Sequence, residues 1–93
     1  MVTTNFGWAI EQLRAGQRVA RKGWNGKGMW LCLMPGVTIP EGLVNGRTKG
    51  FWPQGDLPCQ PYIVMRTARG EWQPGWLASQ ADMLAEDWEI TEG

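Results

Sequence analysis

The run MWLCLMP, residues 29–35, restricts the possible folds of this chain more than any other stretch. It is apolar throughout, with a glycine before it and a proline at its end. Short apolar runs bounded by such residues are typical of strands that are covered on both faces of a sheet. The run therefore predicts a central strand with cover on both sides.

The segment before this strand predicts one short helix within residues 3–17. Thr4 or Asn5 can cap its start, and Gly16 stands where a left-handed residue would end it. The apolar residues of its inner face follow helical spacing: Phe6, Ala9, Ile10 and Leu13.

Residues 17–22 predict a strand that forms a hairpin with the apolar run through the turn GWNGKG. Residues 61–78 predict a second hairpin that turns near Arg69 and Gly70, and residues 79–91 a helical turn followed by a strand. The expected fold class is α+β: a small antiparallel β-sheet with an N-terminal helix and a short C-terminal helical turn. We expect a single domain over residues 1–93, with a variable loop at residues 37–60.

The seven tryptophans exceed what one core of a 93-residue domain can enclose, so some should line a pocket or a subunit interface. Residues 1–50 carry seven Lys or Arg and two Glu, whereas residues 51–93 carry two Arg and seven acids. Such a chain can pair its own halves or a second copy of itself, and it suits general nucleic-acid binding poorly. We therefore expect a homo-oligomer and no nucleic-acid partner.

Catalytic and metal chemistry is sparse in this sequence. It has no histidine, no phosphate-binding glycine motif and only Cys32 and Cys59 as thiols, so we expect no metal and no cofactor. The acids Asp82, Glu86 and Asp87 cluster and could supply a catalytic carboxylate pair, but acids at the start of a short helix more commonly stabilise its dipole. The sequence also lacks a signal peptide and a membrane-length apolar run, which predicts a cytoplasmic protein without a membrane partner.

Binding chemistry is better represented. Four basic residues without an intervening acid surround Trp24: Arg18, Arg21, Lys22 and Lys27. The stretch WLASQAD adds Trp76 and the polar side chains Ser79, Gln80 and Asp82. Aromatic rings stack on bases, cations neutralise phosphates, and these polar groups suit ribose and base edges. Alternatively, Trp24 folds back over the sheet and the basic run is a solvated strand face.

The stretches RKGWNGKGMWLCLMPG and LPCQPYIVMRTARGEWQPGWLASQADMLAEDWEI resemble the Thoeris anti-defense 2 family of small phage and prophage proteins. The resemblance covers residues 5–36 and 61–90, and GWLASQADMLAEDW is its most specific part. It implies a cytoplasmic homotetramer that sequesters glycocyclic ADP-ribose, the Thoeris immune signal, without cleaving it. It further implies that some members hold cyclic dinucleotides.

By that resemblance, Trp24 and Trp76 are the aromatic walls of the nucleotide site. The same resemblance makes Asn25, Ser79, Gln80 and Asp82 candidates for polar contacts, and Arg21 or Lys22 a candidate for the pyrophosphate. Residues 37–60 match no fixed pattern of the family, which leaves the ligand and the role of this loop open. Two other classes of function also stay open: an enzyme that degrades the same signal, and a structural module of a phage particle.

Overall fold

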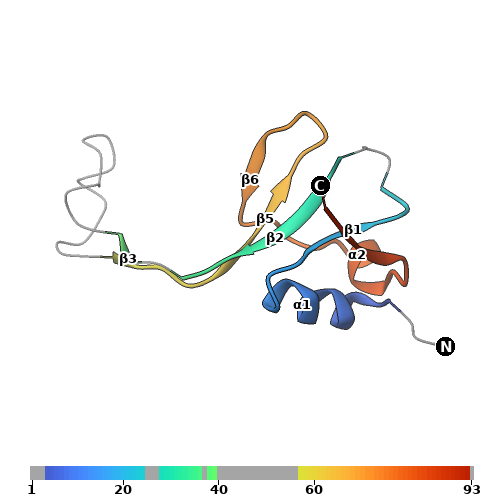
Figure 1. Ribbon diagram of the computed structural model, residues 1–93, viewed down its shortest axis with the longest axis horizontal. Coiled ribbons are helices and arrows are strands. Elements are labelled where there is room, and N and C mark those ends of the chain that lie inside the picture. The colour runs from blue at the N-terminus through green and yellow to red at the C-terminus, as the bar shows by residue number, and fades with distance from the viewer. Residues whose placement is uncertain (1–3, 25–27, 37, 40–56, 93) are drawn as a thin grey trace.

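The computed structural model describes residues 4–24, 28–36, 38–39 and 57–92. Within them, helix α1 (Phe6–Arg14) precedes β1 (Arg18–Arg21) and β2 (Trp30–Met34). The short strands β3 (Thr38–Ile39) and β4 (Leu57–Pro58) follow, and then β5 (Tyr62–Arg66) and β6 (Trp72–Pro74). Helix α2 (Gln80–Leu84) and β7 (Trp88–Thr91) end the chain. This α+β arrangement confirms the predicted fold class (Figure 1).

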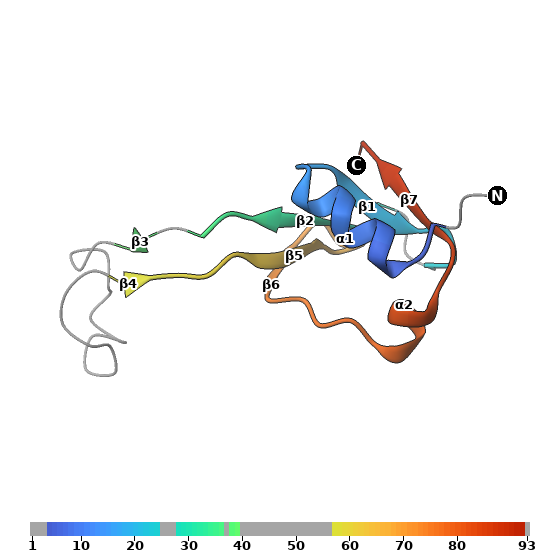
Figure 2. The same cartoon turned by 90° about the horizontal axis from the view of Figure 1, so that it is seen from below.

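The main sheet has the strand order β6-β5-β2-β1-β7, and all of its neighbours are antiparallel. Strand β2 lies in the middle, which confirms that the apolar run is the central strand. Strands β3 and β4 pair with each other beyond the ends of β2 and β5, at a distance from the main sheet (Figures 1 and 2). The segment predicted as a variable loop therefore begins and ends in a short ribbon, and residues 40–56 lie outside the described part.

Local sequence signals explain both helices. The side chain of Asn5 accepts a hydrogen bond from the Trp8 N–H at 2.9 Å, and Gly16 has φ 87°, so one of the two predicted caps and the predicted left-handed residue are confirmed. Ser79 caps α2: its Oγ accepts from the Asp82 N–H at 3.1 Å, and Asp82 Oδ2 accepts from the Ser79 N–H at 3.1 Å.

The core lies between α1 and one face of the sheet (Figure 2). Register places Val19 opposite Leu31 and Leu31 opposite Met65, so the three side chains share this face. They pack with Ala9 and Leu13 of α1 and with Trp88 of β7, and these six residues form the buried cluster.

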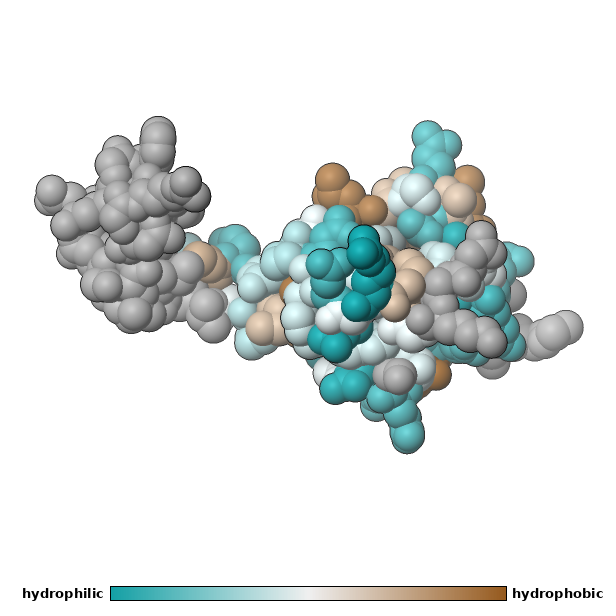
Figure 3. All heavy atoms as spheres, turned by 90° about the horizontal axis from the view of Figure 1, so that it is seen from above, coloured by the Kyte–Doolittle hydropathy of each residue, from teal (hydrophilic) through white to brown (hydrophobic). Residues whose placement is uncertain are grey.

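The prediction that β2 is covered on both faces is wrong for the other face of the sheet, which we call the outer face. Trp30 lies on this outer face and is only 8% exposed, but Arg18 and Trp72 cover it rather than a second layer. Met34, Tyr62 and Trp72 remain exposed there, Trp72 by 54%. Figure 3, seen from the side opposite to Figure 2, shows apolar side chains interspersed with hydrophilic ones. Among the described residues, helices cover one face of the sheet, and the outer face is open in the single chain.

Candidate functional site

Three tryptophans from distant parts of the chain meet beside the core. Trp24 follows β1, Trp76 lies between β6 and α2, and Trp88 begins β7. Their rings form edge-to-face pairs, with centroids 5.4 Å apart for Trp24 and Trp88 and 6.4 Å apart for both pairs that include Trp76. Phe6 of α1 packs on Trp88 at 5.6 Å. The two predicted aromatic residues of the site, Trp24 and Trp76, are therefore direct neighbours.

The turn that carries Trp24 is held by Asp87. The Lys22 N–H donates to the Asp87 carbonyl at 3.1 Å, and the Gly23 N–H donates to Asp87 Oδ2 at 2.9 Å. A Cβ at Gly23 would lie 2.9 Å from the same oxygen, so a larger residue would push against the carboxylate that the Gly23 N–H binds. The turn places Trp24, which is half-buried, against the core cluster. The interpretation that Trp24 folds back over the sheet thus describes its position, and a role in ligand binding stays a prediction.

Asp82 joins the tryptophans to β1 and α2. Its Oδ1 accepts from Arg21 Nη1 at 2.9 Å and from the Trp24 indole N–H at 3.3 Å. Its Oδ2 accepts from the N–H and the hydroxyl of Ser79, and its backbone carbonyl accepts from the Trp88 indole N–H at 3.1 Å. The side chain of Asp82 is only 13% exposed. We call the set Arg21, Ser79, Asp82 and Asp87 the Asp82 network.

The charges in the Asp82 network are paired with one another. Arg21 Nε donates to Asp87 Oδ1 at 3.0 Å, so one guanidinium bridges two carboxylates. Burial by itself would raise the pKa of Asp82, but hydrogen bonds from Arg21, Ser79 and Trp24 outweigh it and hold that pKa below its usual value. Partial burial would also raise the pKa of Asp87, but the contacts with Arg21 and Gly23 outweigh it, so that pKa is lowered too. Both carboxylates are therefore ionised at neutral pH.

The other predicted polar residues divide into internal and open side chains. Arg21 and Ser79 both donate to the Asp82 carboxylate, whereas the side chains of Lys22 and Gln80 are exposed and have no polar partner in the described part of the chain. Asn25 lies outside the described residues. Sequence reasoning named Asp87 only as part of an acidic cluster and did not foresee that Gly23 and Arg21 would both bind it. The glycine before Trp24 was the available signal.

Several features that would indicate other functions are not found in the described ranges. No group of three or more His, Cys, Asp or Glu residues there could hold a metal ion. Among the same residues, no helix is both long and apolar enough to cross a membrane.

Comparison with known proteins identifies the domain. A model of the "Tad2-like: Thoeris anti-defense 2-like domain" matches residues 4–91. The chain is also 36% identical over 86 residues to the "Thoeris anti-defense 2" protein of Bacillus phage SP01, an alignment that covers 92% of each chain. The match includes every described residue of the Asp82 network and the tryptophan cluster.

Proposed function

Because the chain belongs to the Thoeris anti-defense 2 family, we propose that it is a phage anti-defense protein that binds and sequesters a cyclic nucleotide immune signal. The proposed ligand is glycocyclic ADP-ribose, and the site of action is the cytoplasm of the host bacterium. The observation that carries the proposal is the meeting of Trp24 and Trp76, from the two halves of the chain. The exposed side chains of Lys22 and Gln80 lie within a few positions of these tryptophans in the sequence.

The residues proposed for this site fall into two groups. Lys22 and Gln80 are open, so their side chains can contact a pyrophosphate and a ribose or base edge directly. Arg21 and Ser79 already bind the Asp82 carboxylate, which suits residues that position Trp24 and α2. We propose that the first group binds the ligand and that the second group holds the aromatic walls in place.

The alternative of an enzyme that degrades the signal has less support. A carboxyl group that acts as a general acid near neutral pH needs a raised pKa, as in glycosidases. The pKa values of Asp82 and Asp87 are both lowered, and Arg21 binds both carboxylates. A base with a lowered pKa and a fixed guanidinium partner is also weak at activating water. We therefore propose sequestration without cleavage.

The test is recovery of the ligand. The protein is incubated with glycocyclic ADP-ribose, separated from free ligand and denatured by heat, and the released compound is analysed by mass spectrometry and on the Thoeris receptor. We expect the intact, active signal in a fixed ratio to protein. A linear ADP-ribose product that accumulates with time and disappears in Asp87→Asn would show instead that the protein is an enzyme.

We further propose that the protein acts as a homo-oligomer of four copies, as the resemblance implies. The support is the open outer face of the sheet, where Met34, Tyr62 and Trp72 are exposed and Pro74 borders them. Exposed large apolar side chains gathered on one sheet face are typical of interaction surfaces. A phage structural module would also use such a face, but the family match favours the anti-defense role.

A further inference from the structure

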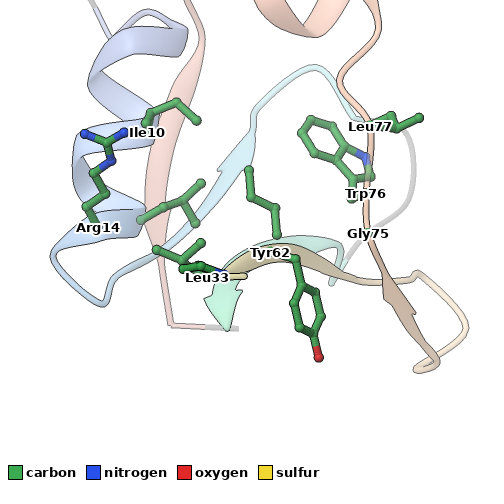
Figure 4. Close-up of a pocket in the computed structure, with 10 residues that line it drawn as sticks. Ile10, Arg14, Leu33, Tyr62, Gly75, Trp76 and Leu77 are labelled. Carbon is green, nitrogen blue, oxygen red and sulfur yellow. The ribbon is translucent and has the colours of Figure 1, made fainter. Parts of the chain in front are cut away.

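A hollow of about 680 Å³ lies on the helix side of the sheet, next to the tryptophan cluster. Figure 4 shows that Ile10 and Arg14 of α1 stand on one side of it and that Gly75 and Trp76 stand on the other. Leu33 of β2 lies between these two sides. A volume of this size is within the usual range of small-molecule sites.

The described residues that line this hollow are mostly apolar and contain a single formal charge. None of them is a carboxylate, and Arg14 is the only cation among them. No acid among these lining residues would repel an anion. In Figure 4 the side chain of Arg14 runs along α1, and because it is exposed it can turn its guanidinium toward an anion in the hollow. A ligand with an apolar planar part and an anionic part matches this distribution.

The charge of Arg14 is available to a ligand. Arg14 is exposed and makes no ion pair or side-chain hydrogen bond within the described residues, unlike Arg21, which binds two carboxylates. It stands in the last turn of α1, where the helix dipole favours a cation. An arginine so placed can bind a phosphate without breaking a polar contact to the described residues.

The ring of Trp76 and its indole N–H are also available to a ligand. It packs edge-to-face with Trp24 and Trp88 on one side and lines the hollow on the other. The described residues provide no acceptor for its indole N–H, whereas the indoles of Trp24 and Trp88 both donate to Asp82. The ring therefore offers the hollow an aromatic surface and carries an uncommitted donor.

We propose that this hollow is the base-and-phosphate subsite of the nucleotide site, with the base packed on Trp76 and the phosphate bound by Arg14. The inference rests on the proposed function for the identity of the full ligand. It adds a site residue, Arg14, on a different element from the cationic residues beside Trp24. It also predicts selectivity: a phosphorylated nucleoside binds the hollow more tightly than the nucleoside alone.

The experiment uses two small probes and the full signal. Binding of 5′-AMP, adenosine and glycocyclic ADP-ribose to the full chain is measured by tryptophan fluorescence and calorimetry. In the unmodified protein we expect AMP to bind at least about tenfold more tightly than adenosine, as a charge-assisted phosphate contact provides. Arg14→Gln should abolish this preference and leave adenosine binding unchanged. Arg14→Lys should retain part of it.

The matched control is Arg69→Gln, which removes an exposed arginine at the turn between β5 and β6. Its binding of all three probes should equal that of the unmodified protein. Equal binding of AMP and adenosine, or an AMP preference that survives in Arg14→Gln, would overturn the subsite. If glycocyclic ADP-ribose still binds in that case, the proposed function stands without the subsite. If AMP shows the Arg14-dependent preference and glycocyclic ADP-ribose does not bind, the subsite stands and the proposed signal is wrong.

Discussion

Replacing Asp82 by asparagine tests the network that holds the tryptophan cluster. The carboxylate oxygens accept from Arg21 and Trp24 on one side and from the N–H and hydroxyl of Ser79 on the other. An asparagine has the same shape but only one acceptor oxygen, so its amide group must face one of these two sets of donors.

The expected cost follows from the contacts that are lost. A hydrogen bond to a charged group contributes about 1.5–3 kcal/mol, and a neutral one about 1 kcal/mol. Whichever way the new amide turns, the charge pair with Arg21 is lost. Arg21 keeps its ion pair with Asp87, which limits the loss of stability. We expect Asp82→Asn to lower the free energy of unfolding by about 2–3 kcal/mol, or roughly 10–20 °C in Tm for a domain of this size.

The dependence on pH gives a second readout. Because the pKa of Asp82 is lower in the folded than in the unfolded chain, its contribution is complete above the unfolded value of about 3.9. That contribution is lost as the pH falls through the lowered folded value. Between pH 7 and about pH 5 the stability difference between Asp82→Asn and the unmodified protein should therefore be constant. Below about pH 4 it should shrink, and the part due to Asp87 should still titrate in the variant.

Urea unfolding at pH 7, 5 and 3, followed by tryptophan fluorescence, measures both effects. Glu86→Gln is the matched control, because Glu86 is an exposed acid close to Asp82 whose side chain has no polar partner among the described residues. It should change stability by less than about 0.5 kcal/mol. A loss below about 0.5 kcal/mol in Asp82→Asn, or a difference that does not depend on pH, would refute this account of the network.

The remaining predictions concern the tryptophans. Trp30→Ala should lower the free energy of unfolding by about 3–5 kcal/mol, since Trp30 is only 8% exposed, and Trp24→Ala should lower it less because Trp24 is half-buried. Urea unfolding of both variants checks this order, and the reverse order would show that Trp24 contributes more to stability than Trp30. Trp24→Ala and Trp76→Ala should each weaken binding of glycocyclic ADP-ribose by about 1–3 kcal/mol in calorimetry, and unchanged affinity in folded variants would remove both from the site. Light scattering should give a mass well above the 10.4 kDa of one chain, and Trp72→Ser should reduce it; a monomer in the unmodified protein would rule out the oligomer.

Much of the fold was predictable because the signals are local. The Asn5 cap, the positive φ of Gly16 and the Ser79 capping box each depend on residues within a few positions of one another. The apolar run predicted the central strand because its length and its flanking residues belong to one segment. Such features need no knowledge of the rest of the chain.

The contacts within the site could not be predicted, because they depend on pairings between residues far apart in the sequence. Arg21 and Asp82 are 61 positions apart, and they meet because β7 pairs with β1 and brings the end of the chain beside the first hairpin. Continuous apolarity in β2 suggested cover on both faces, but Trp30 is covered by Arg18 and Trp72 from neighbouring positions of the same sheet. An apolar run cannot distinguish cover by a second layer from cover by large side chains of the sheet itself.

The charge asymmetry of the chain bears on which cations remain for a ligand. The halves partly neutralise each other inside the fold: Arg21, from the basic half, binds two carboxylates of the acidic half, and β1 lies against β7. Within the described residues, Lys22 and Arg14 stay without a carboxylate partner. Lys22 is two positions from Trp24, and Arg14 lines the hollow that Trp76 also lines. Internal pairing therefore commits Arg21 to the structural network. Among the described residues it leaves Lys22 and Arg14 without a carboxylate partner, and both can attract an anionic ligand to the site that we propose.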